Sequence, residues 1–156
     1  MTTIKTVTAT VWAVSAAATI GLAAPAHADS AVNLPLTDEV RAELVQAGAA
    51  LTGHPASDYS GLRPGHSYYA YQPDSTSPYY WAAAALWGPK TEEAAIQLQD
   101  QNSYIIFRKG PDPAATWLPI ADGFGPIRTG DTPCPLPESV RDLWQWPAGK
   151  CYPPSS

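Results

Sequence analysis

Residues 67–87 read SYYAYQPDSTSPYYWAAAALW and contain two aromatic segments on either side of a turn. Residues 67–72 are rich in tyrosine, which is typical of a β-strand. Residues 73–78 have the proline, aspartate and serine composition of a turn. The four consecutive alanines of residues 79–87 favour a helix by propensity. This segment is short, however, and follows a ready hairpin partner, so we predict a strand there and keep a helix as the alternative.

Two more strands are predicted further along the chain. Residues 104–109, YIIFRK, have the clearest strand composition. A turn at 110–113, GPDP, precedes a return strand over 116–121. Pro119 has no amide hydrogen to donate, which predicts that this last strand lies at the edge of the sheet.

Residues 92–99 are open to two interpretations. Apolar and polar side chains alternate over 94–99, which favours a strand with one solvated face. Thr91, Glu92 and Glu93 have the composition of a helix start, and a short helix is therefore the second interpretation. Residues 100–103, DQNS, are predicted to form a tight turn.

Helices are predicted near both ends of residues 29–156. Thr37 is a suitable N-cap for a helix over 38–51 that ends at Gly53. Two prolines and three glycines make 53–66 a loop, and 122–137 is predicted to be irregular. Pro137 starts a short helix that ends near Trp146. Short connections favour antiparallel pairing.

The predicted fold class is therefore α+β. We expect an antiparallel meander of four or five short strands, with the N-terminal helix and a short disulfide-tied C-terminal helix on one face. Residues 29–156 have the size of a single domain.

The first 28 residues have the pattern of an export signal. Lys5 precedes an apolar stretch over 7–24, and Pro25-Ala26-His27-Ala28 matches the small-residue site of a signal peptidase. We predict cleavage after Ala28 and a secreted or envelope location, with no membrane attachment afterwards; an uncleaved membrane anchor is the alternative. In the oxidising conditions outside the cell, Cys134 and Cys151 are expected to form one disulfide.

The charge balance excludes several partners. The formal net charge is −5, and Lys5 is the one charged side chain in the predicted signal. An acidic mature chain is unsuited to nucleic acid or anionic lipid. The sequence contains no phosphate-binding glycine loop, dinucleotide motif, His-Glu-x-x-His or Gly-x-Ser-x-Gly, so we expect no cofactor, no metal and no enzyme activity.

Two groups of residues are candidate sites. His54, Asp58 and His66 could form a metal site or a base with its orienting acid, or else stabilise turns. The second group is aromatic: Tyr69, Tyr71 and Trp81 are predicted to bind a ligand, because flat rings are good platforms for sugars and peptides. The alternative is that these rings are ordinary strand residues.

Several segments resemble a known group of proteins. They include Tyr68-Tyr69-Ala70, Trp81-Ala82-Ala83-Ala84, Ser103-Tyr104 before Phe107-Arg108, and the closing Cys134…Trp144…Cys151 pattern. The chain resembles small exported proteins of actinobacteria, including mycobacteria, whose function is uncharacterised. The resemblance implies export and one small domain, and it transfers no catalytic residue.

The leading functional hypothesis is a non-enzymatic exported domain that binds cell-wall glycan, a peptide or another exported protein. One rival is an exported hydrolase that uses His54, Asp58 and His66. Another is an inhibitor of a second exported protein, which would present residues 73–78 to a cleft.

Overall fold

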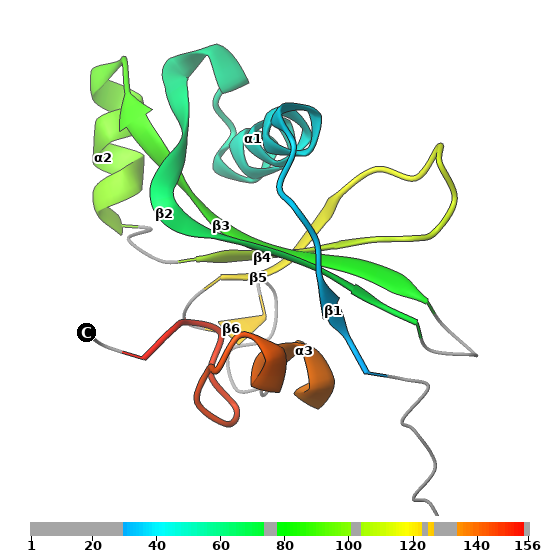
Figure 1. Cartoon of the computed structure of the whole chain (residues 1–156). Coiled ribbons are helices and arrows are strands. Elements are labelled where there is room, and N and C mark those ends of the chain that lie inside the picture. The colour runs from blue at the N-terminus through cyan, green and yellow to red at the C-terminus, as the bar shows by residue number, and fades with distance from the viewer. Residues whose placement is uncertain (1–29, 74–77, 101–103, 123–124, 127–133, 155–156) are drawn as a thin grey trace, which may run out of the picture.

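The computed structural model describes residues 30–73, 78–100, 104–122, 125–126 and 134–154 (Figure 1). Its helices and strands follow one another along the chain in this order: β1 (Val32–Asn33), α1 (Asp38–Thr52), the 3₁₀ turn η1 (Ala56–Asp58), β2 (Tyr59–Gln72), β3 (Tyr79–Pro89), α2 (Glu92–Asp100), β4 (Ile105–Lys109), β5 (Leu118–Asp122), β6 (Gly125–Pro126) and α3 (Glu138–Leu143).

The strands form one antiparallel sheet in which spatial order equals chain order, β1-β2-β3-β4-β5-β6. The α+β class and the meander are therefore confirmed. The four longer strands, β2 to β5, form the body of the sheet, and the two-residue strands β1 and β6 flank it. The preference for a strand over 79–87 is also confirmed, since β3 is paired on both sides.

Helix α1 begins and ends where its composition predicts. The Thr37 side chain accepts a hydrogen bond from the Val40 amide (3.3 Å), and Gly53 closes the helix with a φ of 77°. The helix lies close to the sheet at Gly48, where a Cβ atom would be 3.3 Å from a methyl carbon of Leu86 and 3.4 Å from one of Ile105.

The two faces of the sheet are covered by different elements. On the first, which we call the α1 face, Leu44 of α1 packs with Ala82 and Phe107. On the second, the disulfide face, Ala83 and Ile106 pack against the C-terminal segment. Figure 1 shows α1 on one side of the sheet and α3 on the other.

The prediction that both helices share one face is consequently wrong. Alternate residues of a strand point to opposite faces, and Ala82, Ala83 and Ala84 of β3 are all fully buried. A central strand with apolar side chains on both of its faces needs a layer of other elements packed on each face. The small alanine side chains let both covers lie close to the backbone.

Residues 92–100 form a helix, so the preferred strand over 94–99 is wrong and the second interpretation holds. The Thr91 hydroxyl accepts a hydrogen bond from the Ala94 amide (3.2 Å) and caps α2. Ala94 is fully buried and Leu98, one turn later, is half-buried, whereas Ile96 is 55% exposed. Burial thus follows the period of a helix, although the polarity of the sequence alternates.

Residues 53–66 are also more regular than predicted. They contain η1 and the first half of β2, whose pairing with β3 is interrupted between Leu62 and Ser67. Pro64 and Gly65 lie in this interruption, and Gly65 adopts a φ of 72°. A bulge can hold a proline and a left-handed glycine while the strand continues on either side.

The C-terminal segment closes the disulfide face. The predicted bond joins Cys134 to Cys151, with Cα atoms 5.3 Å apart. Trp144 and Trp146 are buried there, and the Trp144 indole donates to the Asn33 side chain of β1 (3.1 Å). α3 follows Pro137 as predicted. None of the helices in the described ranges combines the length and apolar character needed to cross a bilayer.

Strand β5 is not the edge strand, because β6 pairs outside it. That pairing involves only Ala121 and Asp122, so Pro119 faces no described strand on that side. The predicted signal, residues 74–77 of the first turn, 101–103 of the second, and most of the irregular stretch over 122–137 lie outside the described residues.

Candidate functional site

The interruption in β2 borders a cavity in the described part of the chain. Leu62 pairs with Leu86 and Ser67 pairs with Ala84, so residues 63–66 of β2 stand opposite Ala85 of β3 alone. Extra residues in one strand bend it and redirect side chains. Arg63 and His66, at the two ends of the bulge, both line a cavity between the strands and α2.

We call this cavity, of about 380 Å³, the α2 pocket. Its apolar wall comes from β3 and α2 and consists of Ala85, Leu86, Pro89, Ala95 and Leu98. Its other lining residues are Arg63, His66, Trp87, Gln99 and Tyr104. An apolar wall with a few convergent polar groups is the usual composition of a small-molecule site.

Arg63 and Trp87 form one side of the pocket. The Arg63 guanidinium carbon lies 5.5 Å from the centre of the Trp87 ring, a cation–π contact. Trp87 is 49% exposed, which is unusual for a tryptophan in so small a domain. No described carboxylate forms an ion pair with Arg63, and no Asp or Glu appears in the described lining.

His66 and Tyr104 form the floor. The His66 Nδ1 and the Tyr104 hydroxyl are 2.7 Å apart and share a hydrogen bond. Burial, and then the neighbouring Tyr68, raises the pKa of Tyr104 to about 12, although Arg63 opposes this rise. Tyr104 is therefore a neutral phenol at physiological pH, and the pocket contains no negative charge from it.

An aromatic cluster supports this floor from the disulfide face. The Tyr104 ring packs edge-on against Trp146 at 5.4 Å, and Tyr68 contacts both Tyr104 (5.9 Å) and Trp146 (5.1 Å). These contacts hold the Tyr104 hydroxyl in place beneath His66. The disulfide in turn holds the tail that carries Trp146.

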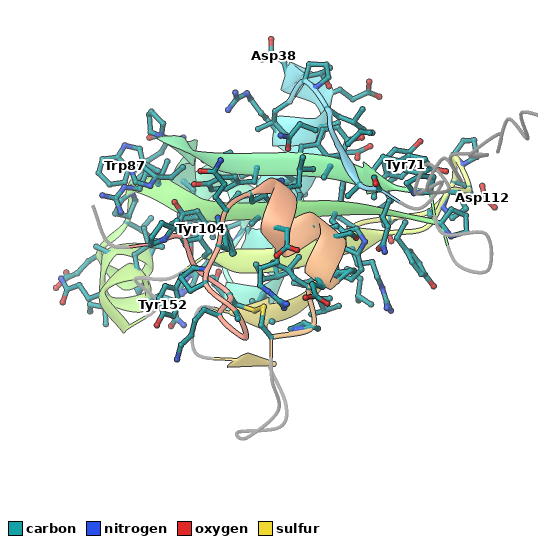
Figure 2. All side chains as sticks on the ribbon, turned by 60° about the horizontal axis from the view of Figure 1, so that its bottom comes forward. Asp38, Tyr71, Trp87, Tyr104, Asp112 and Tyr152 are labelled. Carbon is teal, nitrogen blue, oxygen red and sulfur yellow. A yellow bond between two sulfur atoms is a disulfide. The ribbon has the colours of Figure 1, made fainter. Side chains whose placement is uncertain are left out.

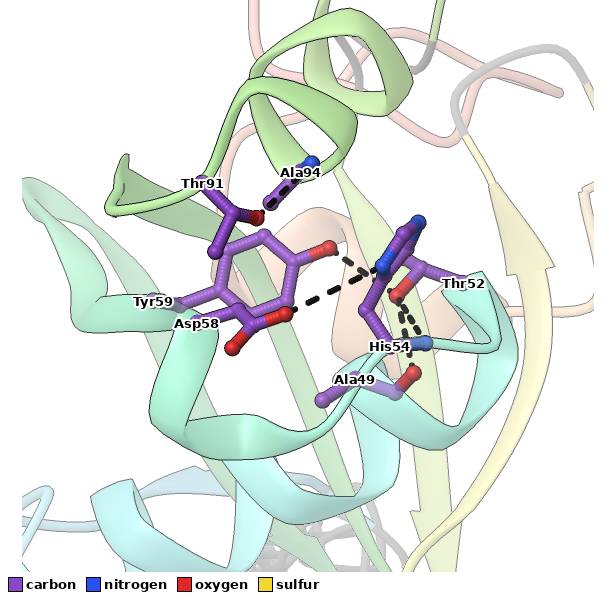
Figure 3. Close-up of polar contacts among 7 residues, drawn as sticks. All are labelled: Ala49, Thr52, His54, Asp58, Tyr59, Thr91 and Ala94. Carbon is purple, nitrogen blue, oxygen red and sulfur yellow. Dashed lines mark hydrogen bonds and ion pairs between the residues drawn. The ribbon is translucent and has the colours of Figure 1, made fainter.

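The three residues of the predicted polar site do not come together. His54 lies near Asp58, with 3.9 Å between Nδ1 and Oδ2, just after the end of α1 (Figure 3). There Thr52 contacts the Tyr59 hydroxyl (3.0 Å), so the surroundings are those of a helix end. His66 instead bonds to Tyr104. Among the described residues, no group of three His, Cys, Asp or Glu side chains could hold a metal ion.

The three predicted ligand-binding aromatics are also separated. Tyr69 and Tyr71 are half-exposed on the α1 face. The centre of the Tyr80 ring lies 6.1 Å from that of Tyr69 and 5.0 Å from that of Tyr71. Trp81 lies on the disulfide face, is 4% exposed and donates its indole hydrogen to Gln72 (3.2 Å). Trp87 and Tyr104 lie toward the opposite end of the sheet from Tyr71 (Figure 2). Ligand binding by these residues stays a prediction.

Sequence reasoning missed Arg63, Gln99 and Tyr104 as site residues. Arg63 lies in a segment that was predicted to be a loop, and Gln99 lies in a segment for which a strand was preferred. One available signal was Arg-Pro-Gly-His immediately before a strongly predicted strand, since proline and glycine beside a strand often mark a bulge.

The fold and the pocket together define a small α+β domain in which the bulged β2–β3 hairpin borders a ligand-sized cavity. No family model, no curated protein and no solved structure matches the chain.

Proposed function

We propose that this chain is an exported, non-enzymatic binding domain that acts at the cell envelope or outside the cell and holds a small ligand in the α2 pocket. The observation that carries the proposal is the α2 pocket itself, in which Arg63, His66 and Tyr104 converge beside the exposed ring of Trp87. Binding sites typically combine an apolar wall with a few well-placed polar groups.

The chemistry of the pocket favours binding over catalysis. A hydrolytic site needs a nucleophile or a base of suitable pKa. No serine, cysteine or carboxylate is found in the described lining, and Tyr104, whose pKa is raised to about 12, stays protonated at physiological pH and is not available as a base. His66 is the one imidazole in that lining, and its Nδ1 is already engaged with the Tyr104 hydroxyl. The polar groups there are suited to donating or sharing hydrogen bonds with a bound molecule.

Export is proposed on separate grounds. The pattern of the first 28 residues, the resemblance to exported actinobacterial proteins and the Cys134–Cys151 bond all agree with it. Cells that express the full chain should release a protein that starts at Asp29 and contains no free thiol. Mass spectrometry of the medium tests this, and an intact Met1 end on the released protein would contradict it.

The pocket is tested by fluorine NMR of protein expressed from the full-length gene with 5-fluorotryptophan. The Trp87 signal is assigned with Trp87→Phe. We expect members of a small-molecule fragment library to shift the Trp87 signal, because that ring lines the pocket. Signals from Trp117 and Trp144, which do not line it, report whether the fold is intact.

A matched pair of variants gives the control. Ala95 lines the pocket from α2, and Ala95→Phe should fill the space and weaken the best fragment at least about tenfold, or 1.4 kcal/mol. Ala50→Phe makes the same change at an exposed position of α1 and should leave binding unchanged. The pocket assignment fails if no fragment moves the Trp87 signal, or if folded Ala95→Phe binds as the wild type does.

A further inference from the structure

The charge of the α2 pocket differs from that of the chain around it. The chain has a formal net charge of −5, yet Arg63 is the one permanently charged side chain in the described lining. A guanidinium that lines a cavity without a carboxylate beside it creates a local positive potential. A negatively charged group is thus the natural complement.

The placement of Arg63 suits a planar anion. Its guanidinium is held 5.5 Å from the centre of the Trp87 ring. A guanidinium can stack on an aromatic ring and still donate two parallel hydrogen bonds from its edge to the two oxygens of a carboxylate. One such cation balances a single negative charge, which favours a carboxylate over a doubly charged phosphate.

His66 and Tyr104 supply polar groups to the same cavity. Their 2.7 Å hydrogen bond uses Nδ1 of His66, which leaves Nε2 for a ligand. The pKa of Tyr104, raised to about 12 chiefly by burial, keeps its hydroxyl protonated across the physiological range. Neither group therefore repels an anion.

The remaining lining selects the body of the ligand. Leu86, Ala95 and Leu98 form an apolar wall, and Trp87 presents a half-exposed flat ring. A volume of about 380 Å³ lies at the small end of the range for ligand cavities, roughly 300–1,000 Å³. The cavity therefore fits a compact, flat, apolar group.

On the basis of the proposed binding function, we infer that the α2 pocket selects a small organic carboxylate whose negative group meets Arg63 and whose flat apolar body lies against Trp87 and α2. Recognition combines charge and shape. A neutral or cationic molecule of the same shape is a poorer ligand.

The test compares probes that share a phenyl ring and differ in the polar or charged group that the ring carries. These are 3-phenylpropionate, 3-phenylpropionamide, 3-phenylpropylammonium and phenyl phosphate, titrated by calorimetry and by the Trp87 fluorine signal. We expect the carboxylate to bind at least tenfold more tightly than the amide. Arg63→Gln should reduce this ratio to near one.

Arg41→Gln is the matched control, because it removes the same charge from an exposed position on α1 that does not line the α2 pocket. It should keep the carboxylate preference. Equal binding of carboxylate and amide, tighter binding of phenyl phosphate, or an unchanged preference in folded Arg63→Gln overturns the inference while the binding function stands. The inference is also overturned if none of these four probes binds while other fragments shift the Trp87 signal. If no molecule of any kind shifts the Trp87 signal, the proposed function fails as well.

Discussion

At the scale of single residues, the Tyr104 hydroxyl links the pocket to the interior of the domain. It contacts His66 on the pocket side, and its ring packs on Tyr68 and Trp146 on the other. Because this phenol is buried, its ionisation opposes folding. The residue therefore has both a structural role and an electrostatic one.

This gives a prediction at alkaline pH. A tyrosine in the unfolded chain loses its proton near pH 10, whereas folded Tyr104 keeps its proton until about pH 12. The folded state then binds more protons, so the free energy of unfolding falls as pH rises from 10 to 12. In Tyr104→Phe that fall should be smaller by about 2 kcal/mol.

Urea unfolding at several pH values measures the difference. Tyr152→Phe controls for the loss of a hydroxyl at an exposed position. An identical alkaline fall in the wild type and in Tyr104→Phe would show that Tyr104 does not contribute. The test depends on slopes against pH, so a uniform loss of stability from the broken His66 contact does not affect it.

Individual site residues could be predicted only in part. The sequence drew attention to His66 and to the aromatic hairpin, and His66 does line the pocket. His66 was predicted to form one polar site with His54 and Asp58 because the three residues are close in sequence. The bulge separates them, since it turns His66 toward Tyr104, which lies far along the chain. Such long-range contacts leave no local pattern.

At the scale of elements, helix α1 approaches the sheet closely at Gly48. Gly48 is buried against Leu86 and Ile105, and a Cβ atom there would lie at or inside the lower limit of ordinary contact with both. A glycine in mid-helix costs about 1 kcal/mol of helix propensity. Its presence here is explained by packing.

The element-scale prediction is a loss of stability in Gly48→Val. The extra carbons must displace Leu86 or Ile105, and overpacking of this kind costs about 1–3 kcal/mol. Ala50→Val, on the exposed side of the same helix, should cost less than about 1 kcal/mol because only propensity changes. Urea unfolding at neutral pH measures both, and equal stability of Gly48→Val and the wild type would contradict the packing account.

The accuracy of the predicted elements depended on whether local signals agreed with burial. Thr37 and Gly53 mark α1 clearly, and the predicted helix over 38–51 is right to within a residue. In α2 the alternating polarity of 94–99 competed with the cap at Thr91. Burial of Ala94 in the core and exposure of Ile96 resolve that competition in favour of a helix, and the sequence alone does not contain this information.

At the scale of the whole molecule, the two covers of the sheet have different roles. The α1 face is closed by a well-capped helix. The disulfide face is closed by a C-terminal segment with one six-residue helix. The Cys134–Cys151 bond closes this segment into a loop, and the hydrogen bond from Trp144 to Asn33 anchors it to β1. A bond that closes a loop across 17 positions contributes about 3 kcal/mol in the chain-entropy view. That anchor keeps Trp146 beneath the floor of the pocket.

The fold class could be predicted because strand composition and short connections are local features. The assignment of both helices to one face could not be corrected from propensity, since Ala82 and Ala83 are equally small and equally apolar. The structure shows that both are buried, Ala82 on the α1 face and Ala83 on the disulfide face. The pocket likewise arises from a bulge, a helix and a strand that meet only after folding.

The most direct test of the account is a crystal structure of the purified protein soaked or co-crystallised with 3-phenylpropionate. We predict that the carboxylate lies against the Arg63 guanidinium and that the phenyl ring lies between Trp87 and α2, with the His66–Tyr104 contact preserved. A ligand bound instead on the Tyr69–Tyr71–Tyr80 surface, or an α2 pocket that stays empty at saturating ligand, would contradict it.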